Sequence, residues 1–309
     1  MQKIHLLSDK IKQSKNPAIS KMFITLKNVR LYNQNWFISF REILDCTLEW
    51  IKYLPKDIDV VVGIPRSGMF VASVIALSLG KPLTSPELFA EGKVWWTKKK
   101  ESQHPIQLRK VLLVDDTIGE GTTFMNAQQI ILEKNPNAEI IKASLFSNPT
   151  PSVQLDYYFT VLSKGYDRFE WGLMHAHVGI TATDMDGILC EECPLDADRD
   201  EEKYKEWIAT VKPYRIPAYE IDAIITSRLE KYRKHTEEWL RKHGVKYKRL
   251  IMWNLPDKKF RTNSAEYKSR ELLKLKPEWY WESNFGEAKQ IWKKTKIPVL
   301  CFDKMILLS

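Results

Sequence analysis

Short apolar runs recur along the chain and predict buried strands. The clearest lie at residues 59–64, 111–114 and 221–225. Apart from Asp59 and Asp222 they are apolar rather than alternating, which is typical of parallel strands buried on both faces. Between the runs, apolar residues at helical spacing predict helices at residues 40–53, 69–79, 124–134 and 229–243. Strands that alternate with helices predict an α/β protein built on parallel sheets.

The same pattern predicts two domains. A chain of 309 residues is long enough to build two cores of ordinary size. At residue 178 the pattern restarts with an apolar strand, VGITATDMDGIL. We therefore predict a first domain at residues 1–177 and a second at residues 178–309, each a doubly wound α/β sheet.

Two adjacent acids and a loop of small residues end one predicted strand. Residues 111–123 read VLLVDDTIGEGTT, in which four apolar residues precede Asp115 and Asp116. Open α/β sheets bind ligands at the carboxyl ends of their strands, and a loop leading into a helix offers N–H groups to a phosphate. Carboxylates beside such a loop suit a phosphorylated sugar, because they accept its ring hydroxyls. The candidate loop residues are Thr117, Gly119, Gly121, Thr122 and Thr123.

A second loop of this kind follows the strand at residues 59–64. It reads GIPRSG and leads into an apolar helix. Small residues allow the backbone to approach an anion closely, and an arginine adds a bidentate fork. Arg66, Ser67 and Gly68 are therefore candidate anion-binding residues.

Together the two loops resemble the binding motifs of type I phosphoribosyltransferases, such as the orotate enzymes. The resemblance implies that the first domain binds phosphoribosyl diphosphate and a base, with a flexible basic loop closing over them and with dimers common. It places Lys98, Lys99 and Lys100 in that loop, and Trp171 is a candidate to stack on the base. The motif departs at Glu120, where the family usually has Thr or Ser, so we expect weakened or altered phosphate binding.

A different pair of acids opens the second predicted domain. Asp184 and Asp186 end its first strand, and side chains at i and i+2 on a strand point the same way. Such a pair can hold Mg²⁺ while one acid attacks phosphorus and the other handles a proton. The pattern resembles the first motif of haloacid-dehalogenase-like phosphatases. By order along the chain, the resemblance gives Thr226 and Lys268 catalytic roles and places Glu282 with the two Asp residues as metal ligands.

The second domain also departs from that family. The family more often has Asp at the last motif, commonly two acids in a row, whereas here Glu282 is followed by Ser283, with Glu287 as a further candidate. Only a helix near residues 201–211 and a Pro-bracketed loop separate the first two predicted strands. We therefore expect a Rossmann-like fold with little or no cap and an open site.

The two resemblances combine into one predicted function. The first domain would transfer ribose 5-phosphate from phosphoribosyl diphosphate to a base-like acceptor, releasing pyrophosphate, and the second would remove the 5'-phosphate. The product would be nucleoside-like, and Mg²⁺ is the expected cofactor. Two alternatives remain: ribosylation of a base or hydroxyl within nucleic acid, and a non-catalytic regulator that senses the diphosphosugar.

The net charge, cysteine content and hydropathy of the chain indicate which ligands and which cellular compartment to expect. The formal net charge of +9 favours anionic ligands, with phosphates first and nucleic acid as a possibility. The four cysteines are too few for a disulfide framework. The amino terminus has no signal-peptide pattern and no apolar run is long enough to span a bilayer, so we expect a cytoplasmic protein without a membrane partner.

Overall fold

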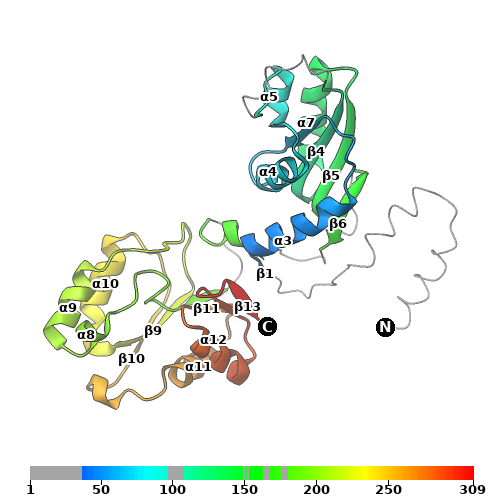
Figure 1. Ribbon diagram of the computed structural model, residues 1–309. Helices are drawn as coiled ribbons and strands as arrows, with labels where there is room; N and C mark the ends of the chain where they lie inside the picture. Colours follow the sequence, from blue (N-terminus) through cyan, green and yellow to red (C-terminus); the bar gives the residue numbers. More distant parts are fainter. Residues whose placement is uncertain (1–36, 97–107, 149–150, 152, 163–167, 176–179) are drawn as a thin grey trace, which may run out of the picture. The chain divides into compact units, whose positions relative to one another are not determined.

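The computed structural model describes residues 37–96, 108–148, 151, 153–162, 168–175 and 180–309. These residues form two compact units (Figure 1). The described part of residues 41–165 makes the first unit. Residues 37–40 and 168–309, where described, make the second.

The first unit is built on a five-stranded sheet in which all neighbouring strands run parallel. Its strands, in their order across the sheet, are β3 (Leu83–Thr84), β2 (Val60–Gly63), β4 (Lys110–Ile118), β5 (Glu139–Ser147) and β6 (Tyr157–Val161). Its helical elements are α3 (Phe40–Trp50), η1 (Ile51–Tyr53), α4 (Gly68–Leu79), α5 (Pro86–Ala90) and α7 (Thr122–Lys134).

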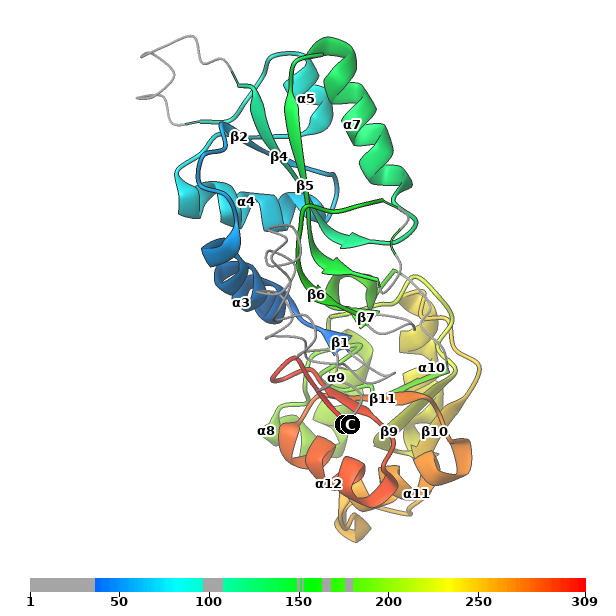
Figure 2. The same ribbon diagram turned by 90° about the vertical axis from the view of Figure 1, so that its right-hand side faces the viewer.

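Both faces of this sheet are covered, which explains its apolar strands. Val60, Val62 and Leu113 pack with Phe124 and Ile131 of α7 in one core cluster. Helix α4 lies against the opposite face of β2 and β4, and Figure 2 shows α4 and α7 on either side of the sheet. A strand between two helical layers has no polar face, so the predicted continuous runs are buried strands.

The second unit has a six-stranded sheet with five parallel strands and one antiparallel edge strand. Across the sheet the order is β10 (Leu250–Trp253), β9 (Ala223–Leu229), β8 (Thr181–Thr183), β11 (Trp279–Glu282), β12 (Val299–Cys301) and β13 (Ile306–Leu308). Its helical elements are α8 (Leu195–Asp198), α9 (Glu201–Thr210), η3 (Glu230–Tyr232), α10 (Arg233–Lys242), η4 (Lys258–Phe260), α11 (Ser264–Leu275) and α12 (Phe285–Thr295).

Strand β11 shows how the second sheet separates two core layers. Trp279 and Trp281 pack on one side with Trp239 of α10, whereas Tyr280 packs on the other with Leu272 of α11. The alternation follows from the two-residue period of a strand. Trp279 and Trp281 meet edge to face, with ring centroids 5.5 Å apart.

Two short segments on either side of the first unit join the second. Strand β1 (Phe37–Ile38) pairs in parallel with β7 (Arg168–Phe169), which leads into η2 (Glu170–Gly172). Phe37 and Leu173 are both buried in the same core cluster as Trp279. In the part of the chain that the structure describes, the first unit is therefore inserted, in chain order, between two parts of the second.

The predicted α/β class with parallel sheets is confirmed. Several expected boundaries were wrong. Leu229, predicted to begin a helix, is the last residue of β9, so the strand predicted to end at residue 225 continues to residue 229, and α10 begins only at Arg233 after a 3-10 turn. Thr117, predicted in the loop after the double acid, lies in β4, which ends at Ile118. Within the stretches that the structure describes, no helix combines the length and apolar character needed to cross a bilayer.

The core of the second unit can be tested at Ile224, which is fully buried on β9. We expect Ile224→Ala to lower the free energy of unfolding by about 2–5 kcal/mol, because it removes buried methyl groups and leaves a cavity. The exposed Leu195 serves as a control, and Leu195→Ala should change it by less than about 0.5 kcal/mol. Urea unfolding curves measure both, and equal losses in the two variants would contradict this core assignment.

Candidate active sites

The first candidate site lies where the strand order of the first sheet changes direction. Strands β2 and β4 are parallel neighbours that continue in opposite directions across the sheet, the position at which such sheets bind ligands. The GIPRSG loop follows β2, and the double acid lies near the carboxyl end of β4. The topology therefore brings both predicted loops to one edge of the sheet.

Gly68 brings the two loops into direct contact. A Cβ atom on this residue would lie 2.6 Å from Oδ1 of Asp115 and 3.1 Å from the carbonyl oxygen of Val114. Only glycine therefore fits at the start of α4 without a shift of β4. The loop before it carries Arg66, which is exposed, and Ser67, which is partly exposed, and the peptide bond between Pro65 and Arg66 is cis.

Asp115 and Asp116 are both buried, the first 9% and the second 2% exposed. Asp115 Oδ1 accepts the backbone N–H of Asp116 at 2.9 Å, and the Thr117 hydroxyl donates to Asp116 Oδ2 at 3.1 Å. Burial and the neighbouring carboxylate of Asp116 raise the pKa of Asp115 to about 9. Asp115 therefore holds a proton at neutral pH, and donors such as sugar hydroxyls would favour its charged form.

The loop after β4 forms a pocket of about 310 Å³ at the start of α7. Gly121 precedes the helix with φ at 80° and, as a glycine, has no side chain to cap the first N–H groups. These N–H groups are consequently available to an anion. The residues that line the pocket are Asp115, Thr117, Ile118, Gly119, Glu120, Gly121, Thr122, Thr123 and Phe124. Glu120 is exposed at its rim and adds a negative charge there.

Two other predicted groups are not among the described residues that line this pocket. Lys98, Lys99 and Lys100 lie outside the described residues. Trp171 lies in the second unit, where its ring stacks on Phe169 at a centroid distance of 4.5 Å and tilts against Phe40 at 5.8 Å.

The second candidate site lies at the corresponding position of the second sheet. Strands β8 and β11 are parallel neighbours from which the sheet extends in opposite directions. Asp184 follows β8, and Glu282 ends β11. Their side chains and that of Glu287 converge on the buried ammonium of Lys268, whose Nζ donates to the three carboxylates at 2.6, 2.8 and 3.0 Å respectively.

Asp186 is held by a cation that the sequence analysis did not select. Arg228 is fully buried and donates to Asp186 Oδ1 from Nη2 at 2.6 Å and from Nε at 3.1 Å. The thiol of Cys190 also donates to Oδ1, at 3.2 Å. The sequence contained a signal for this residue, because Arg228 is a charged residue in the buried strand β9, two residues after Thr226.

A pocket of about 580 Å³ opens over these groups. It is lined by Asp184, Asp186, Glu192, Ser227, Trp253, Arg261, Thr262, Ser264, Lys268, Glu282, Ser283, Asn284, Glu287 and Asp303. The predicted Thr226 is fully buried, and its hydroxyl accepts the backbone N–H of Arg228 at 3.2 Å. The neighbouring Ser227 lines the pocket instead and lies 2.5 Å from the hydroxyl of Ser264.

Negative charge dominates this pocket. Its lining contains six carboxylates and two cations. Burial raises the pKa of Asp184 well above its usual range against the opposing effect of Lys268, whose own pKa is raised by its carboxylate partners. Partial burial and the nearby Asp186 raise the pKa of Glu192 to about 7. A further cation would relieve this repulsion.

The donor set fits Mg²⁺ by its chemistry, because carboxylate oxygens are the ligands this ion prefers. Across residues 180–309 and the other described stretches, no three acidic, His or Cys side chains are gathered as a ready metal-binding group. Lys268 accounts for this, because its ammonium lies among the carboxylates of Asp184, Glu282 and Glu287. Mg²⁺ binding by Asp184, Asp186 and Glu282 stays a prediction.

The segment between β8 and β9 forms no separate lid. Tyr204 and Ile208 of α9 are buried in the core with Ile225 of β9. The helix therefore belongs to the layer that covers the sheet, and none of its residues lines the pocket.

Comparison with known proteins identifies one part of the chain. Residues 35–177 match the family described as phosphoribosyl transferase domain. This match confirms the predicted resemblance to phosphoribosyltransferases over that range. The matched range contains both loops of the first site and ends before Asp184.

A curated relative matches the same half of the chain. The orotate phosphoribosyltransferase of Sulfurisphaera tokodaii is 28% identical over 113 residues, which are 37% of this chain and 53% of the relative. This chain therefore spans about half the length of the relative that it matches.

Solved structures resemble the chain at low sequence identity. The purine phosphoribosyltransferase of Pyrococcus horikoshii is 22% identical, with 45% of this chain and 94% of that chain covered and a TM-score of 0.33. The xanthine-guanine-hypoxanthine phosphoribosyltransferase of Helicobacter pylori is 17% identical, with 44% and 92% covered and a TM-score of 0.34. A chain of the Pnkp1/Rnl/Hen1 complex is 13% identical, with 92% of both chains covered and a TM-score of 0.28.

The raised pKa of Asp115 predicts how the free energy of unfolding changes with pH. Its pKa is 3.8 when unperturbed and about 9 in the folded protein, so the folded state holds a proton that the unfolded state has lost. The free energy of unfolding should fall as pH rises between these values, by at most about 1.4 kcal/mol per pH unit. Asp115→Asn should flatten this decline between pH 5 and 8.

Urea unfolding at pH 5, 6, 7 and 8 measures the effect. The exposed Asp45 of α3 provides the control, because Asp45→Asn should leave the pH dependence as it is in the unmodified protein. An identical decline in Asp115→Asn would rule out Asp115 as its source.

Proposed function

We propose that the first unit is a phosphoribosyltransferase and that the second is a phosphatase acting on its product. In this proposal, ribose 5-phosphate passes from phosphoribosyl diphosphate to a base-like acceptor, and the 5'-phosphate is then hydrolysed. The observation that carries the first half is the contact of Gly68 with Asp115, because it joins an anion loop and a double acid in one site. The match of residues 35–177 to a phosphoribosyl transferase domain supports it.

The proposed transferase uses each part of the first site differently. Asp115 and Asp116 accept the ribose hydroxyls and hold the sugar in place. The N–H groups at the start of α7 bind the 5'-phosphate, while Arg66 and the backbone around Ser67 bind the pyrophosphate. Mg²⁺ bound with the diphosphate would offset its charge as the bond to C1 breaks. Lys98, Lys99 and Lys100 remain candidates to cover the site.

The proposed phosphatase rests on the convergence of Asp184 and Glu282 on Lys268. Asp184 attacks phosphorus, so that an oxygen–phosphorus bond forms while the bond to the leaving alcohol breaks. Asp186 gives that alcohol a proton and later takes one from the attacking water, which releases phosphate from Asp184. Lys268 neutralises the phosphoryl oxygens, and Arg228 holds the side chain of Asp186 in place through hydrogen bonds from Nε and Nη2.

The proposed sequence can be tested by adding phosphoribosyl diphosphate, Mg²⁺ and a panel of free bases, and following pyrophosphate and phosphate in time. Pyrophosphate should appear first and phosphate second, with a transient ribosylated 5'-phosphate between them. Phosphate without that intermediate would contradict the sequence.

Asp184→Asn should separate the two activities. We expect phosphate release to fall by about 10³-fold or more, because the nucleophile is lost, while pyrophosphate release continues and the 5'-phosphorylated product accumulates. The exposed Asp196 of α8 is a matched control, and Asp196→Asn should keep both activities. Unaltered phosphate release in Asp184→Asn would disprove the assigned nucleophile.

Asp116→Asn should affect the first activity alone. Replacing a carboxylate that accepts a sugar hydroxyl should lower kcat/KM for phosphoribosyl diphosphate by about 5- to 150-fold, the equivalent of one lost charged hydrogen bond. Hydrolysis of an added nucleoside 5'-monophosphate should continue as in the unmodified protein. A loss of both activities would instead indicate a general folding defect.

A further inference from the structure

A second large pocket adjoins the pocket of Asp184. It measures about 610 Å³ and shares two lining residues with that pocket, Trp253 and Thr262. Its lining consists of Trp253, Leu255, Phe260, Thr262, Glu266, Tyr267, Arg270, Leu273, Lys274 and Lys294. We call it the aromatic–basic pocket. Because the two pockets share part of their walls, a ligand in one can extend into the other.

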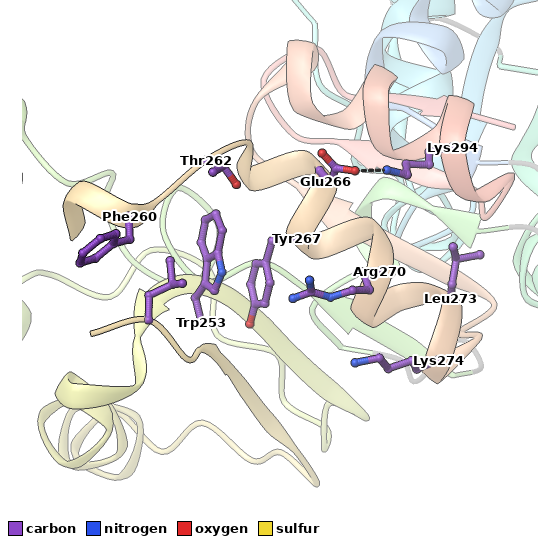
Figure 3. Close-up of a pocket in the computed structure, with 10 residues that line it drawn as sticks. Trp253, Phe260, Thr262, Glu266, Tyr267, Arg270, Leu273, Lys274 and Lys294 are labelled. Atoms are coloured by element: carbon purple, nitrogen blue, oxygen red, sulfur yellow. Dashed lines mark hydrogen bonds and ion pairs between the residues drawn. The ribbon is translucent and has the colours of Figure 1, made fainter. Parts of the chain in front are cut away.

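Aromatic rings form much of the wall. Trp253 and Tyr267 stack in parallel with ring centroids 4.6 Å apart and are nearly buried. Phe260 of η4 is 51% exposed and Leu273 of α11 is 46% exposed, so both offer apolar surface to a ligand. Figure 3 shows Phe260 at one end of the pocket, with the stacked pair between it and Arg270. An exposed ring at the edge of a pocket suits a flat ligand ring.

The charge of this wall is opposite to that of the neighbouring pocket. Arg270, Lys274 and Lys294 line it with one acid, Glu266. Arg270 and Lys274 also pair with Glu271, and Lys294 pairs with Glu266 at 2.6 Å. The three cations remain 63%, 66% and 48% exposed, and such surface pairs are weak. These three side chains can therefore leave their present partners and bind an anion in the pocket.

Helix α11 sets the spacing between the two pockets. Lys268 faces the proposed phosphatase site, whereas the preceding Tyr267 faces the aromatic–basic pocket. Arg270 and Lys274 lie two and six residues further along, about 3 and 9 Å on the helix axis. One nucleotide can span this distance, so a phosphate at Lys268 and a second anion at Arg270 or Lys274 fit one ligand.

We propose that the aromatic–basic pocket binds the base and a second phosphate of the nucleotide whose terminal phosphate is hydrolysed at Asp184. The proposal rests on the phosphatase function proposed above and extends its substrates, beyond the single-phosphate product of the first unit, to a nucleotide that carries another phosphate besides the one removed. A nucleoside bisphosphate and the phosphorylated end of an oligonucleotide share this chemistry. Phe260 stacks on the base, and Arg270 and Lys274 bind the retained phosphate.

The experiment compares four phosphatase substrates in the full-length protein with Mg²⁺. They are p-nitrophenyl phosphate, a nucleoside 5'-monophosphate, a nucleoside 3',5'-bisphosphate and a 5'-phosphorylated decanucleotide. We expect kcat/KM to rise in this order up to the bisphosphate. A further rise for the decanucleotide, with a steep fall on adding salt, would identify nucleic acid ends as the source, and equal values would identify the free nucleotide.

Two variants test the assigned contacts. Phe260→Ala should lower kcat/KM for the bisphosphate about tenfold relative to its effect on p-nitrophenyl phosphate, the size of one lost base stack. The double variant Arg270→Gln with Lys274→Gln should reduce the preference for the bisphosphate over the monophosphate by about tenfold. Exposed residues outside the pocket supply the matched controls, Tyr214→Ala and Lys289→Gln with Lys293→Gln, which should preserve both ratios.

Binding distinguishes failure of this proposal from failure of the phosphatase function. Calorimetric titration of the bisphosphate into the unmodified protein and into Phe260→Ala requires no turnover. If Phe260→Ala binds the bisphosphate more weakly and no substrate is hydrolysed, the proposal that the aromatic–basic pocket binds nucleotides holds and the proposed phosphatase function is wrong. Equal binding, or hydrolysis of a phosphotyrosyl peptide as fast as that of the bisphosphate, would overturn the proposal.

Discussion

The buried ammonium of Lys268 is the interaction on which the second unit depends. Asp184 and Glu282 are 6% and 1% exposed, and two carboxylates so deep in a protein repel each other strongly unless a cation lies between them. Lys268 supplies that cation from α11, and so fixes the helix against the ends of β8 and β11. Arg228 performs the corresponding role for Asp186 from within β9. The same ion pairs therefore balance charge in the site and hold its helix and strands together.

The two sheets use the same topological solution with different electrostatics. Each places a pair of acids next to the point where the strand order changes direction. In the first sheet, no cation of the described residues lies between Asp115 and Asp116, and Asp115 retains a proton. In the second, buried Lys268 and Arg228 offset part of the negative charge. The first arrangement suits a neutral diol, and the second suits a phosphoryl group.

The sequence was sufficient to predict elements whose signal is local. Continuous apolar runs gave the parallel strands around Val62 and Leu113, because burial on both faces leaves no polar positions. Asp115, Asp184, Lys268 and Glu282 could be placed from motifs, and the structure gathers the carboxylates of Asp184 and Glu282 around the ammonium of Lys268.

Other features depend on contacts between distant residues and left little sequence signal. Arg228 and Asp186 are 42 residues apart, and only the fold shows that they pair. The stacking of Trp253 on Tyr267, from β10 and α11, likewise follows from the packing of a strand against a helix. The pairing of β1 with β7 joins residues 131 positions apart in register. Local patterns carry no information about such partners.

The pairing of β1 with β7 affects how the chain folds during translation and how it can be divided into fragments. Phe37 is synthesised before the first unit, yet its core partners, including Leu173 and Trp279, come after it. During translation this ring stays without them until almost the whole polypeptide has left the ribosome. A fragment starting at residue 178 would likewise lack both Phe37 and Leu173, and it would expose the apolar surface that they cover. A cut at residue 178 therefore divides this core cluster between the two fragments.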